Sequence, residues 1–401
     1  MNFDLRDPPA GFVDDPYPVY RALRESEPVR RMPDGSVFLT RFDDLSTVYR
    51  SPCASSDKTR EFAPRFGQGS PLFEHHTTSL VFNDPPLHTR VRRLLLGALN
   101  QRAIARMERG VVLLVDGLLD ALPGAATGGA VDLIEHFASA IPVEVIGNLL
   151  AFPREDRAPL RGWSLAILAA LEPRPDATML AAGHRAVSDF AARLDDLIAE
   201  RRAKPLDPDE DVLTRLIEGE VDGERLSAAQ LVHNCIFLLN AGHETTANLI
   251  GNGVDALMRF PDEQRRLVAN PRLLPSAIEE LLRFESPLQL NNRALVGPLD
   301  LGAERLDAGT LVTLCIGAAN RDPAQFADPD RLDVGRRPNR QLAFGHGDHA
   351  CAGMNVARLE ARIAIGALLA RHPRIVHHGD PVRDRRVRFR GFSRLPVALH
   401  G

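Results

Sequence analysis

One cysteine of this chain lies in a glycine-rich turn that leads directly into an apolar helix. The segment reads Phe-Gly-His-Gly-Asp-His-Ala-Cys-Ala-Gly over residues 344–353. Its glycines allow the backbone to approach a flat ligand closely, and the N-terminus of the following helix favours the thiolate form of Cys351. Because a thiolate is a good metal ligand, the segment predicts a metal-binding loop.

Three other interpretations of this loop are weaker. The pattern Gly-x-Gly-x-x-Ala at 345–350 matches a loose dinucleotide fingerprint, but no acidic residue follows about 20 positions later. His346, His349 and Cys351 are candidate zinc ligands, but no second Cys/His pair stands at ligand spacing elsewhere. A lone cysteine is most often a buried structural residue, but the further motifs described below argue against that interpretation here.

A long helix is predicted between Ser227 and Pro261. Ser227 and Gln230 form a capping box, and no proline interrupts the segment, so the helix can run for about 31 residues, or roughly 46 Å. Its middle reads Ala-Gly-His-Glu-Thr-Thr over 241–246. Small residues leave room for a ligand there, and threonine hydroxyls can distort the helix by bonding to its backbone. A zinc-protease motif is excluded, because position 247 is alanine where a second histidine is required.

Two further segments carry charged pairs at helical spacing. Glu280 and Arg283 share a face of the helix predicted over 276–284, a pattern that any solvated ion pair also produces. His88 and Arg92 share a face of a helix that begins after two prolines. Two cationic donors on one face suit a pair of carboxylates, which are costly to bury without partners.

Taken in order, these motifs resemble those of the cytochrome P450 family. The loop at 344–353 matches the haem-binding pattern F-x-x-G-x-x-x-C-x-G, and the resemblance extends over residues 14–399. It implies a mainly α (α+β) fold, a helical bundle around a haem with a small strand-rich edge, formed by residues 1–401 as a single domain. The implied cofactor is haem b, and Cys351 is the implied axial ligand, which favours O–O cleavage.

The resemblance also implies roles for other residues. Glu244 and Thr245 would relay protons during oxygen activation, and Glu280 and Arg283 would form a buried structural clamp. The residues implied to hold the cofactor, with four basic groups for the haem propionates, are Phe344, Gly353, His88, Arg92, Arg293 and His349. The residues expected by position to line the substrate pocket are Phe237, Leu238, Ala241, Gln289, Leu290, Asn291 and Phe392.

The resemblance therefore predicts a haem-thiolate monooxygenase that inserts one atom of dioxygen into a small organic substrate. Electrons would come from a separate ferredoxin with its reductase, because no flavin or nicotinamide domain is present. Four arginines are candidates for docking an acidic ferredoxin: Arg90, Arg93, Arg358 and Arg362. Two alternatives stay open, a peroxide-using haem-thiolate enzyme, which would usually lack the Glu244–Thr245 pair, and a non-catalytic haem-binding protein.

Composition excludes other classes of protein. The balance of 49 basic against 53 acidic residues leaves no electrostatic footprint for nucleic acid. Four scattered cysteines indicate a reducing compartment without a disulfide framework. The first 30 residues are dotted with charges, unlike a signal peptide, and no apolar run approaches the roughly 18 residues of a membrane span. A cytoplasmic protein without a membrane anchor is predicted.

Local patterns predict elements outside these motifs. Helices are expected over 154–171 and 177–202, on either side of a hinge at 173–176. Residues 54–80 have weak periodicity and many polar side chains, so a loop-rich segment is expected there. Strands are expected over 37–40, 387–389 and 395–397, the last two around a turn at 391–393, and a flexible connection is expected over 123–129.

Overall fold

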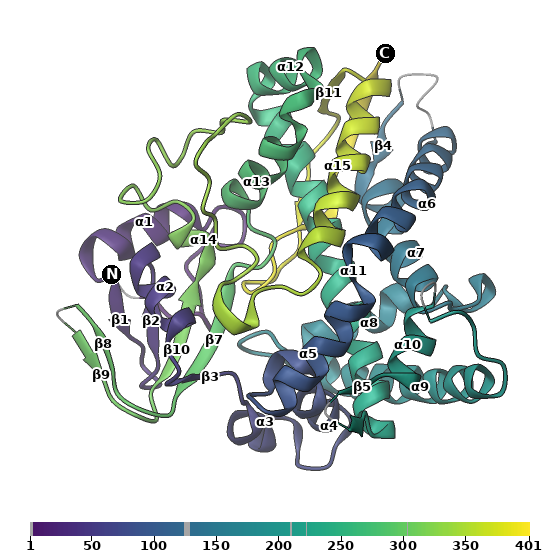
Figure 1. The fold of residues 1–401 in the computed structure, drawn as a ribbon. Coiled ribbons are helices and arrows are strands. Elements are labelled where there is room, and N and C mark those ends of the chain that lie inside the picture. The colour runs from purple at the N-terminus through teal and green to yellow at the C-terminus, as the bar shows by residue number, and fades with distance from the viewer. Residues whose placement is uncertain (1–2, 124–128, 209–210, 222, 303) are drawn as a thin grey trace. The chain divides into compact units, whose positions relative to one another are not determined.

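Helices predominate in the structure, a computed structural model that describes residues 3–123, 129–208, 211–221, 223–302 and 304–401 (Figure 1). Short strands gather in small sheets, so the predicted mainly α fold with a small strand-rich part is confirmed. The chain forms two compact units. The first unit contains residues 1–55, 112–140 and 245–401, and the second contains residues 56–111 and 141–244.

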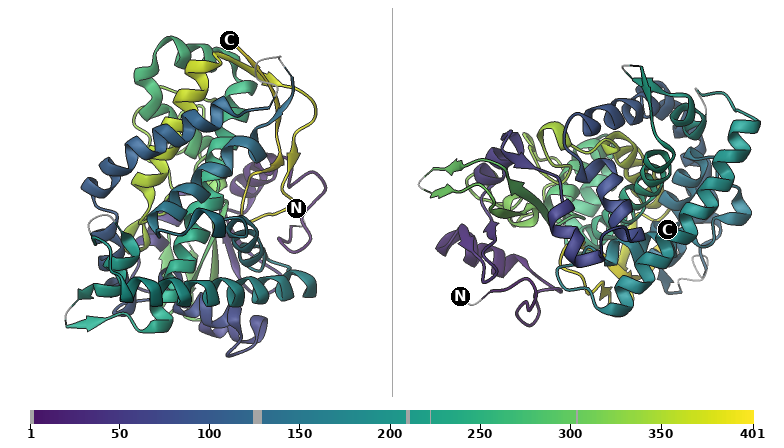
Figure 2. Two further views of the ribbon diagram at one scale, coloured as in Figure 1. Left: turned by 90° about the vertical axis from the view of Figure 1, so that its right-hand side faces the viewer. Right: turned by 90° about the horizontal axis from the view of Figure 1, so that it is seen from below.

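A five-stranded sheet gives the first unit its β-rich part (Figures 1 and 2). Its order is β1 (Val29–Arg31), β2 (Val37–Leu39), β10 (Leu311–Cys315), β7 (Leu290–Leu295) and β3 (Ala54–Ser55). The strands β2 and β10 are parallel, whereas the other neighbours are antiparallel. Alternating side chains such as Val37, Leu39, Val312 and Leu314 are fully buried in one core cluster. The strand predicted over 37–40 is therefore confirmed.

The first unit also contains helices. They are α1 (Tyr17–Ser26), α2 (Phe42–Arg50), the π-helix η3 (Ile134–Ala138), α12 (Pro261–Ala269), η5 (Pro271–Leu273), α13 (Leu274–Phe284), α14 (Ile316–Ala319), η6 (Gly347–His349) and α15 (Met354–Arg371). The helices α13 and α15 pack against each other. In this contact the Leu274 side chain packs closely on Gly366. A Cβ added at Gly366 would lie 3.0 Å from Leu274 Cδ1.

The C-terminal strands differ in part from the prediction. A three-stranded sheet has the order β11 (Arg374–His377), β14 (Pro396–His400) and β4 (Val131–Asp132), and two hairpins pair β12 (Val382–Arg383) with β13 (Phe392–Arg394) and β8 (Leu299–Leu301) with β9 (Glu304–Leu306). The strand predicted over 387–389 is reduced to an isolated antiparallel bridge between Phe389 and Leu288. Gln289 N–H donates to the Arg388 carbonyl and Arg390 N–H to the Pro287 carbonyl, both at 2.8 Å. The predicted turn at 391–393 is instead mostly strand β13.

The second unit is helical apart from one small hairpin. Its elements are α3 (Thr59–Phe66), α4 (Pro71–Thr78), η1 (Leu80–Phe82), α5 (Leu87–Ala98), most of α7 (Ala140–Leu149), η4 (Arg154–Asp156), α8 (Leu160–Ala169), α9 (Ala177–Ala203), α10 (Val212–Glu218), β5 (Glu220–Val221) and β6 (Glu224–Arg225). The helix α9 packs on both α8 and α4. The helix predicted over 177–202 is confirmed, whereas the one predicted from 154 begins only at Leu160, after Pro159 at its N-cap.

The loop-rich interpretation of residues 54–80 is wrong, because two helices lie there. The side chain of Ser70 caps α4 by accepting a hydrogen bond from Phe73 N–H at 3.4 Å. Buried aromatic side chains, Phe62 and Phe66 on α3 and Phe73 on α4, hold both helices against the unit. Burial of these few large groups outweighs the polar composition on which the prediction relied. The flexible connection expected over 123–129 falls mostly on residues outside the described ranges.

The helices α6 (Gln101–Asp120) and α11 (Ala228–Arg259) contribute residues to both units, as does α7 through Ala140. The capping box predicted for α11 is confirmed. Ser227 N–H donates to Gln230 Oε1 at 3.0 Å, and Gln230 N–H donates to Ser227 Oγ at 3.2 Å. The helix then runs for 32 residues to Arg259, as the absence of proline predicted.

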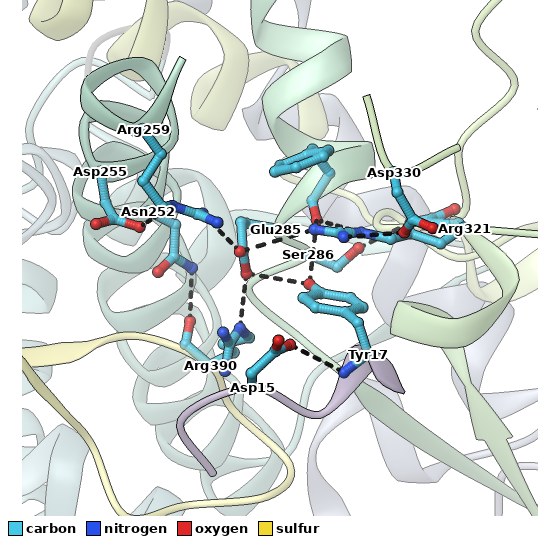
Figure 3. A network of polar contacts seen from close by, with 12 residues as sticks. Asp15, Tyr17, Asn252, Asp255, Arg259, Glu285, Ser286, Arg321, Asp330 and Arg390 are labelled. Atoms are coloured by element: carbon cyan, nitrogen blue, oxygen red, sulfur yellow. Dashed lines mark hydrogen bonds and ion pairs between the residues drawn. The ribbon is translucent and has the colours of Figure 1, made fainter. Parts of the chain in front are cut away.

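A buried carboxylate ties the end of α11 to three other segments of the first unit (Figure 3). Glu285 accepts hydrogen bonds from Arg390 at 2.6 Å, Arg259 at 2.7 Å and the Tyr17 hydroxyl at 3.0 Å. Burial alone would raise the pKa of Glu285, but the surrounding arginines, Arg390 first, hold it well below its usual value. The charge network thereby joins α1, α11, the residue after α13 and the segment before β13.

Candidate functional site

The cysteine loop is a tight turn between η6 and α15. The backbone N–H of Cys351 donates to the Phe344 carbonyl at 2.8 Å, which closes the loop three residues before the helix begins at Met354. Cys351 is partly exposed, unlike Cys235 and Cys315, which are buried. The loop therefore presents a thiol at a helix N-terminus without sealing it in the core.

Glycines give this loop its shape. Gly345 and Gly347 have φ angles of +66° and +70°, which residues with side chains rarely adopt. A Cβ at Gly347 would also lie 2.5 Å from the Tyr49 carbonyl oxygen. At Gly353, by contrast, an added Cβ meets no atom within 4 Å. A partly exposed thiol beside open space in a glycine loop fits a flat, iron-containing cofactor.

Arg358 supports the loop from the first turns of α15. Its guanidinium lies 4.6 Å from the centre of the Phe344 ring and pairs with Glu279 at 2.6 and 2.9 Å. The hydrogen bond to Glu279 raises the pKa of Arg358, and the proximity of Cys351 adds to that effect. Arg358 is thus paired within the chain, and its role in docking a ferredoxin stays a prediction. Arg90 likewise pairs with Glu224, and its docking role also stays a prediction.

The Glu280–Arg283 pair is a fully buried ion pair with an N–O distance of 2.7 Å. Arg283 also donates to the carbonyls of Asn320 and Pro329, both at 2.8 Å. Sequence analysis missed the third member, Arg336, whose Nε lies 3.1 Å from both oxygens of Glu280. No local pattern connects residues so distant along the chain. The cluster holds the irregular segment that precedes the cysteine loop.

Arg293 and the cysteine loop meet at one residue that the sequence did not indicate, Tyr49. The Arg293 guanidinium lies 5.5 Å from the centre of the Tyr49 ring, and Asn291 approaches the Tyr49 hydroxyl at 3.5 Å. Arg293 also donates to Asn291 Oδ1 at 3.2 Å. Because the carbonyl of Tyr49 faces Gly347, this tyrosine connects a predicted propionate partner to the loop. A lone tyrosine in a helix gives no sequence signal for such a role.

Four predicted pocket residues make contacts within the chain. Leu290 belongs to a packed cluster with the N-terminal aromatic residues. Phe392 is buried under the guanidinium of Arg383, at 3.6 Å from the ring centre. Gln289 donates to the Ser286 carbonyl at 2.7 Å, and the partly buried Asn291 holds Arg293 as described. Their role in lining the substrate pocket stays a prediction.

The middle of α11 keeps one face accessible. Phe237, Ala241 and Thr245 follow one another at four-residue spacing, so they lie on the same face. Ala241 is exposed and the other two are partly exposed, although most neighbouring residues of the helix are buried. Leu238 and Glu244 are among these buried neighbours. An accessible face in the middle of so long a helix fits a bound cofactor or substrate.

The remaining predicted cofactor residues lie on two elements. His88 and Arg92 are one turn apart on α5, in the second unit, where His88 is buried and Arg92 is partly exposed. His349 ends η6 in the first unit, two residues before Cys351. The role of these three residues in holding the cofactor stays a prediction.

Comparison with known proteins decides what this arrangement is. A model of the family described as "Cytochrome P450" matches residues 171–398. Vitamin D(3) 25-hydroxylase of Pseudonocardia autotrophica is 39% identical over 396 residues, covering 97% of this chain and 94% of that protein. The chain belongs to the cytochrome P450 family. Cytochrome P450 monooxygenase PikC of Streptomyces venezuelae is 36% identical, covering 96% of this chain and 91% of that protein. The crystal structure of CalO2 matches with a TM-score of 0.91 at 31% identity, covering 99% of this chain and 98% of that chain.

Family membership fixes the class of reaction and the cofactor. The chain is a haem-thiolate monooxygenase, its cofactor is iron protoporphyrin IX, and it uses dioxygen, a small-molecule substrate and redox partners. These statements confirm the predicted enzyme class and cofactor. Within the described part of the chain, no helix has the length and apolar character needed to cross a bilayer.

Proposed function

We propose that Cys351 is the axial ligand of the haem iron in this cytochrome P450. The observation that carries the proposal is the closed glycine loop just before α15. The N–H of the partly exposed Cys351 donates a hydrogen bond to the Phe344 carbonyl and closes this loop. Open space beside Gly353 supports placing the porphyrin there. When bound, the haem supplies the chemistry that activates dioxygen and oxidises the substrate.

The propionate groups of the haem need cationic or hydrogen-bonding partners. We assign this role to Arg293, His349, His88 and Arg92. Arg293 is only 5% exposed and is held in place by Tyr49 and Asn291, so its guanidinium is already oriented before the cofactor binds. A guanidinium fixed in this way loses little side-chain entropy when it pairs with a carboxylate.

Proton delivery is assigned to the pair in the middle of α11. Glu244 is buried and Thr245 is partly exposed on the face shared with Ala241. We propose that the Thr245 hydroxyl donates a proton toward the reaction site and that the Glu244 carboxylate helps replace it. Phe237, Leu238 and Ala241 are proposed to form part of the wall of the substrate site.

The substrate is proposed to be a largely apolar organic molecule. One relative is named a vitamin D(3) 25-hydroxylase, and the accessible face of α11 in this chain consists of an aromatic ring, an alanine methyl and a threonine. The electron donor is proposed to be a ferredoxin with its reductase, acting in the cytoplasm. That all 401 residues function as one domain stays a prediction, which the continuous helices α6 and α11 support.

The ferrous-CO spectrum tests the ligand assignment. Purified protein should show the red-shifted Soret band of thiolate ligation, and Cys351→Ser should abolish it. Cys53→Ser is the matched control, because Cys53 is also partly exposed but lies outside the loop. A band that survives in Cys351→Ser, or disappears in Cys53→Ser alone, would refute the assignment.

A further inference from the structure

Tyr49, the second-to-last residue of α2, contacts two segments that the proposed function assigns to the haem. Its carbonyl oxygen would lie 2.5 Å from a Cβ at Gly347, and its ring atom Cε1 would lie 3.9 Å from a Cβ at Gly345. The Arg293 guanidinium lies over the same ring, 5.5 Å from its centre. Tyr49 is only 8% exposed and belongs to the buried cluster of strands β2 and β10. One residue fixed in the core therefore touches both the cysteine loop and a proposed propionate partner.

Neutral groups contact the Arg293 guanidinium. Its Nη1 donates to Asn291 Oδ1 at 3.2 Å and to the Asn292 carbonyl at 2.8 Å. The Tyr49 ring adds a contact of a different kind, because an aromatic face attracts a guanidinium without accepting any of its N–H groups. Tyr49 therefore restrains the position of the guanidinium and consumes neither its charge nor a donor.

The ring of Tyr49 makes this contact, whereas its hydroxyl contributes little. Asn291 Nδ2 approaches the hydroxyl at 3.5 Å, which is at the limit of a hydrogen bond. A phenylalanine at this position would keep the aromatic face and lose only the long contact. A leucine would remove the face.

Haem is a rigid ligand that the proposed function attaches at two places, the iron at Cys351 and a propionate at Arg293. Two attachments to one rigid molecule reinforce each other when their relative position is set before binding. A long arginine side chain that must be immobilised during binding weakens this effect, because its rotamer entropy is lost at that moment. In Tyr49 the backbone touches the loop and the ring restrains the arginine, so both attachments are referred to one residue.

We propose that Tyr49 is a positioning residue for the haem, which holds Arg293 in a set place relative to the cysteine loop. Through Arg293 it slows the loss of haem and raises the reduction potential of the bound haem. The second effect follows because reduction adds an electron to the haem, and a fixed guanidinium nearby stabilises the added charge. This inference rests on the proposed function, since it takes Cys351 as the axial ligand and Arg293 as a propionate partner.

Transfer of haem from the ferric holoprotein to excess apomyoglobin measures haem loss without using enzyme activity. Tyr49→Leu should lose haem about threefold to tenfold faster than the parent, a ratio that corresponds to about 0.7–1.4 kcal/mol. Tyr49→Phe should stay within about twofold of the parent, because the aromatic face remains. Tyr20→Leu is the matched control and should also stay within about twofold, since Tyr20 is a buried tyrosine of the same unit that packs on Phe12 and Tyr17.

A double-mutant cycle with Arg293→Gln separates positioning from a general structural role. Arg293→Gln alone should speed haem loss and lower the reduction potential, measured by spectroelectrochemical titration. Tyr49→Leu should lower the potential in the parent background. In the Arg293→Gln background it should leave the potential unchanged and alter haem loss by less than about twofold, because the group it positions is gone. If Tyr49→Leu does not fold, Tyr49→Met in both backgrounds makes the same comparison.

Three results would overturn the proposal: equal effects of Tyr49→Leu in the two backgrounds, haem loss in Tyr49→Leu as slow as in the parent, or haem loss in Tyr49→Phe as fast as in Tyr49→Leu. Failure of the proposed function has a different signature. Arg293→Gln alone would then leave both haem loss and the potential unchanged, or the thiolate CO band would be absent, and the inference would fall with it.

Discussion

A buried carboxyl group on α15 should make the stability of this protein depend on pH. Glu360 is 2% exposed, and its Oε2 has no hydrogen-bond partner among the described residues. Val356 and Ala364, one turn before and after it, are buried on the same face of the helix. Burial therefore penalises the ionised form and raises the pKa of Glu360 from 4.5 to about 8.

The sign and the size of the effect follow from this shift. Between pH 4.5 and 8 the folded protein keeps a proton on Glu360 that the unfolded chain releases. The free energy of unfolding therefore falls as pH rises through this window, by up to about 1.4 kcal/mol per pH unit. At pH 7 the accumulated loss is about 3 kcal/mol as an upper limit. Below pH 4.5 the contribution is constant.

Urea denaturation of the haem-loaded protein at pH 5.5, 6.5 and 7.5, followed by far-UV circular dichroism, measures this slope. Glu360→Gln cannot ionise, so it should be more stable than the parent at pH 7.5, by an amount that shrinks toward pH 5.5. Glu25→Gln, an exposed substitution on α1, is the control and should leave the slope unchanged. A stability difference between Glu360→Gln and the parent that does not vary with pH would refute the reasoning.

Three other changes test the remaining assignments. Thr245→Ala should keep haem content and substrate binding but divert electrons to hydrogen peroxide, because proton delivery is misdirected; an unchanged ratio of product to reductant would remove Thr245 from the mechanism. Glu285→Gln should lower the free energy of unfolding by about 3–5 kcal/mol, since the buried Arg390 and the more exposed Arg259 lose their partner, whereas Asp330→Asn, at a half-exposed ion pair, should cost less than about 1 kcal/mol. Urea titration separates the two, and equal losses would contradict the network. Arg362→Glu should slow reduction by an acidic ferredoxin at low salt but not at 1 M salt, where the Debye length is about 3 Å; equal rates at low salt would place docking elsewhere.

Local sequence patterns determined the elements whose signals are contained within a few residues. The capping box at Ser227 and the absence of proline fixed the long helix α11, and both capping hydrogen bonds are present. The motifs around Cys351, Glu244, Glu280 and His88, taken in order, indicated the family. In the cysteine loop, the positive φ angles at 345 and 347 require glycine, so the backbone of the turn itself explains that part of the pattern. In both places the local structure is caused by residues within the same short segment, so the sequence of that segment predicts it.

Tertiary structure decided what depends on residues distant along the chain. Arg336 completes the Glu280 cluster, and Tyr49 joins Arg293 to the cysteine loop, but neither belongs to a local pattern. Polar residues at 289 and 291 suggested a substrate site, yet their partners are neighbouring backbone, Tyr49 and Arg293. The imidazoles of α4 meet Asn240 only after α4 and α11 pack together. A hydrogen bond requires atoms about 3 Å apart, and only the folded chain brings such residues within that distance.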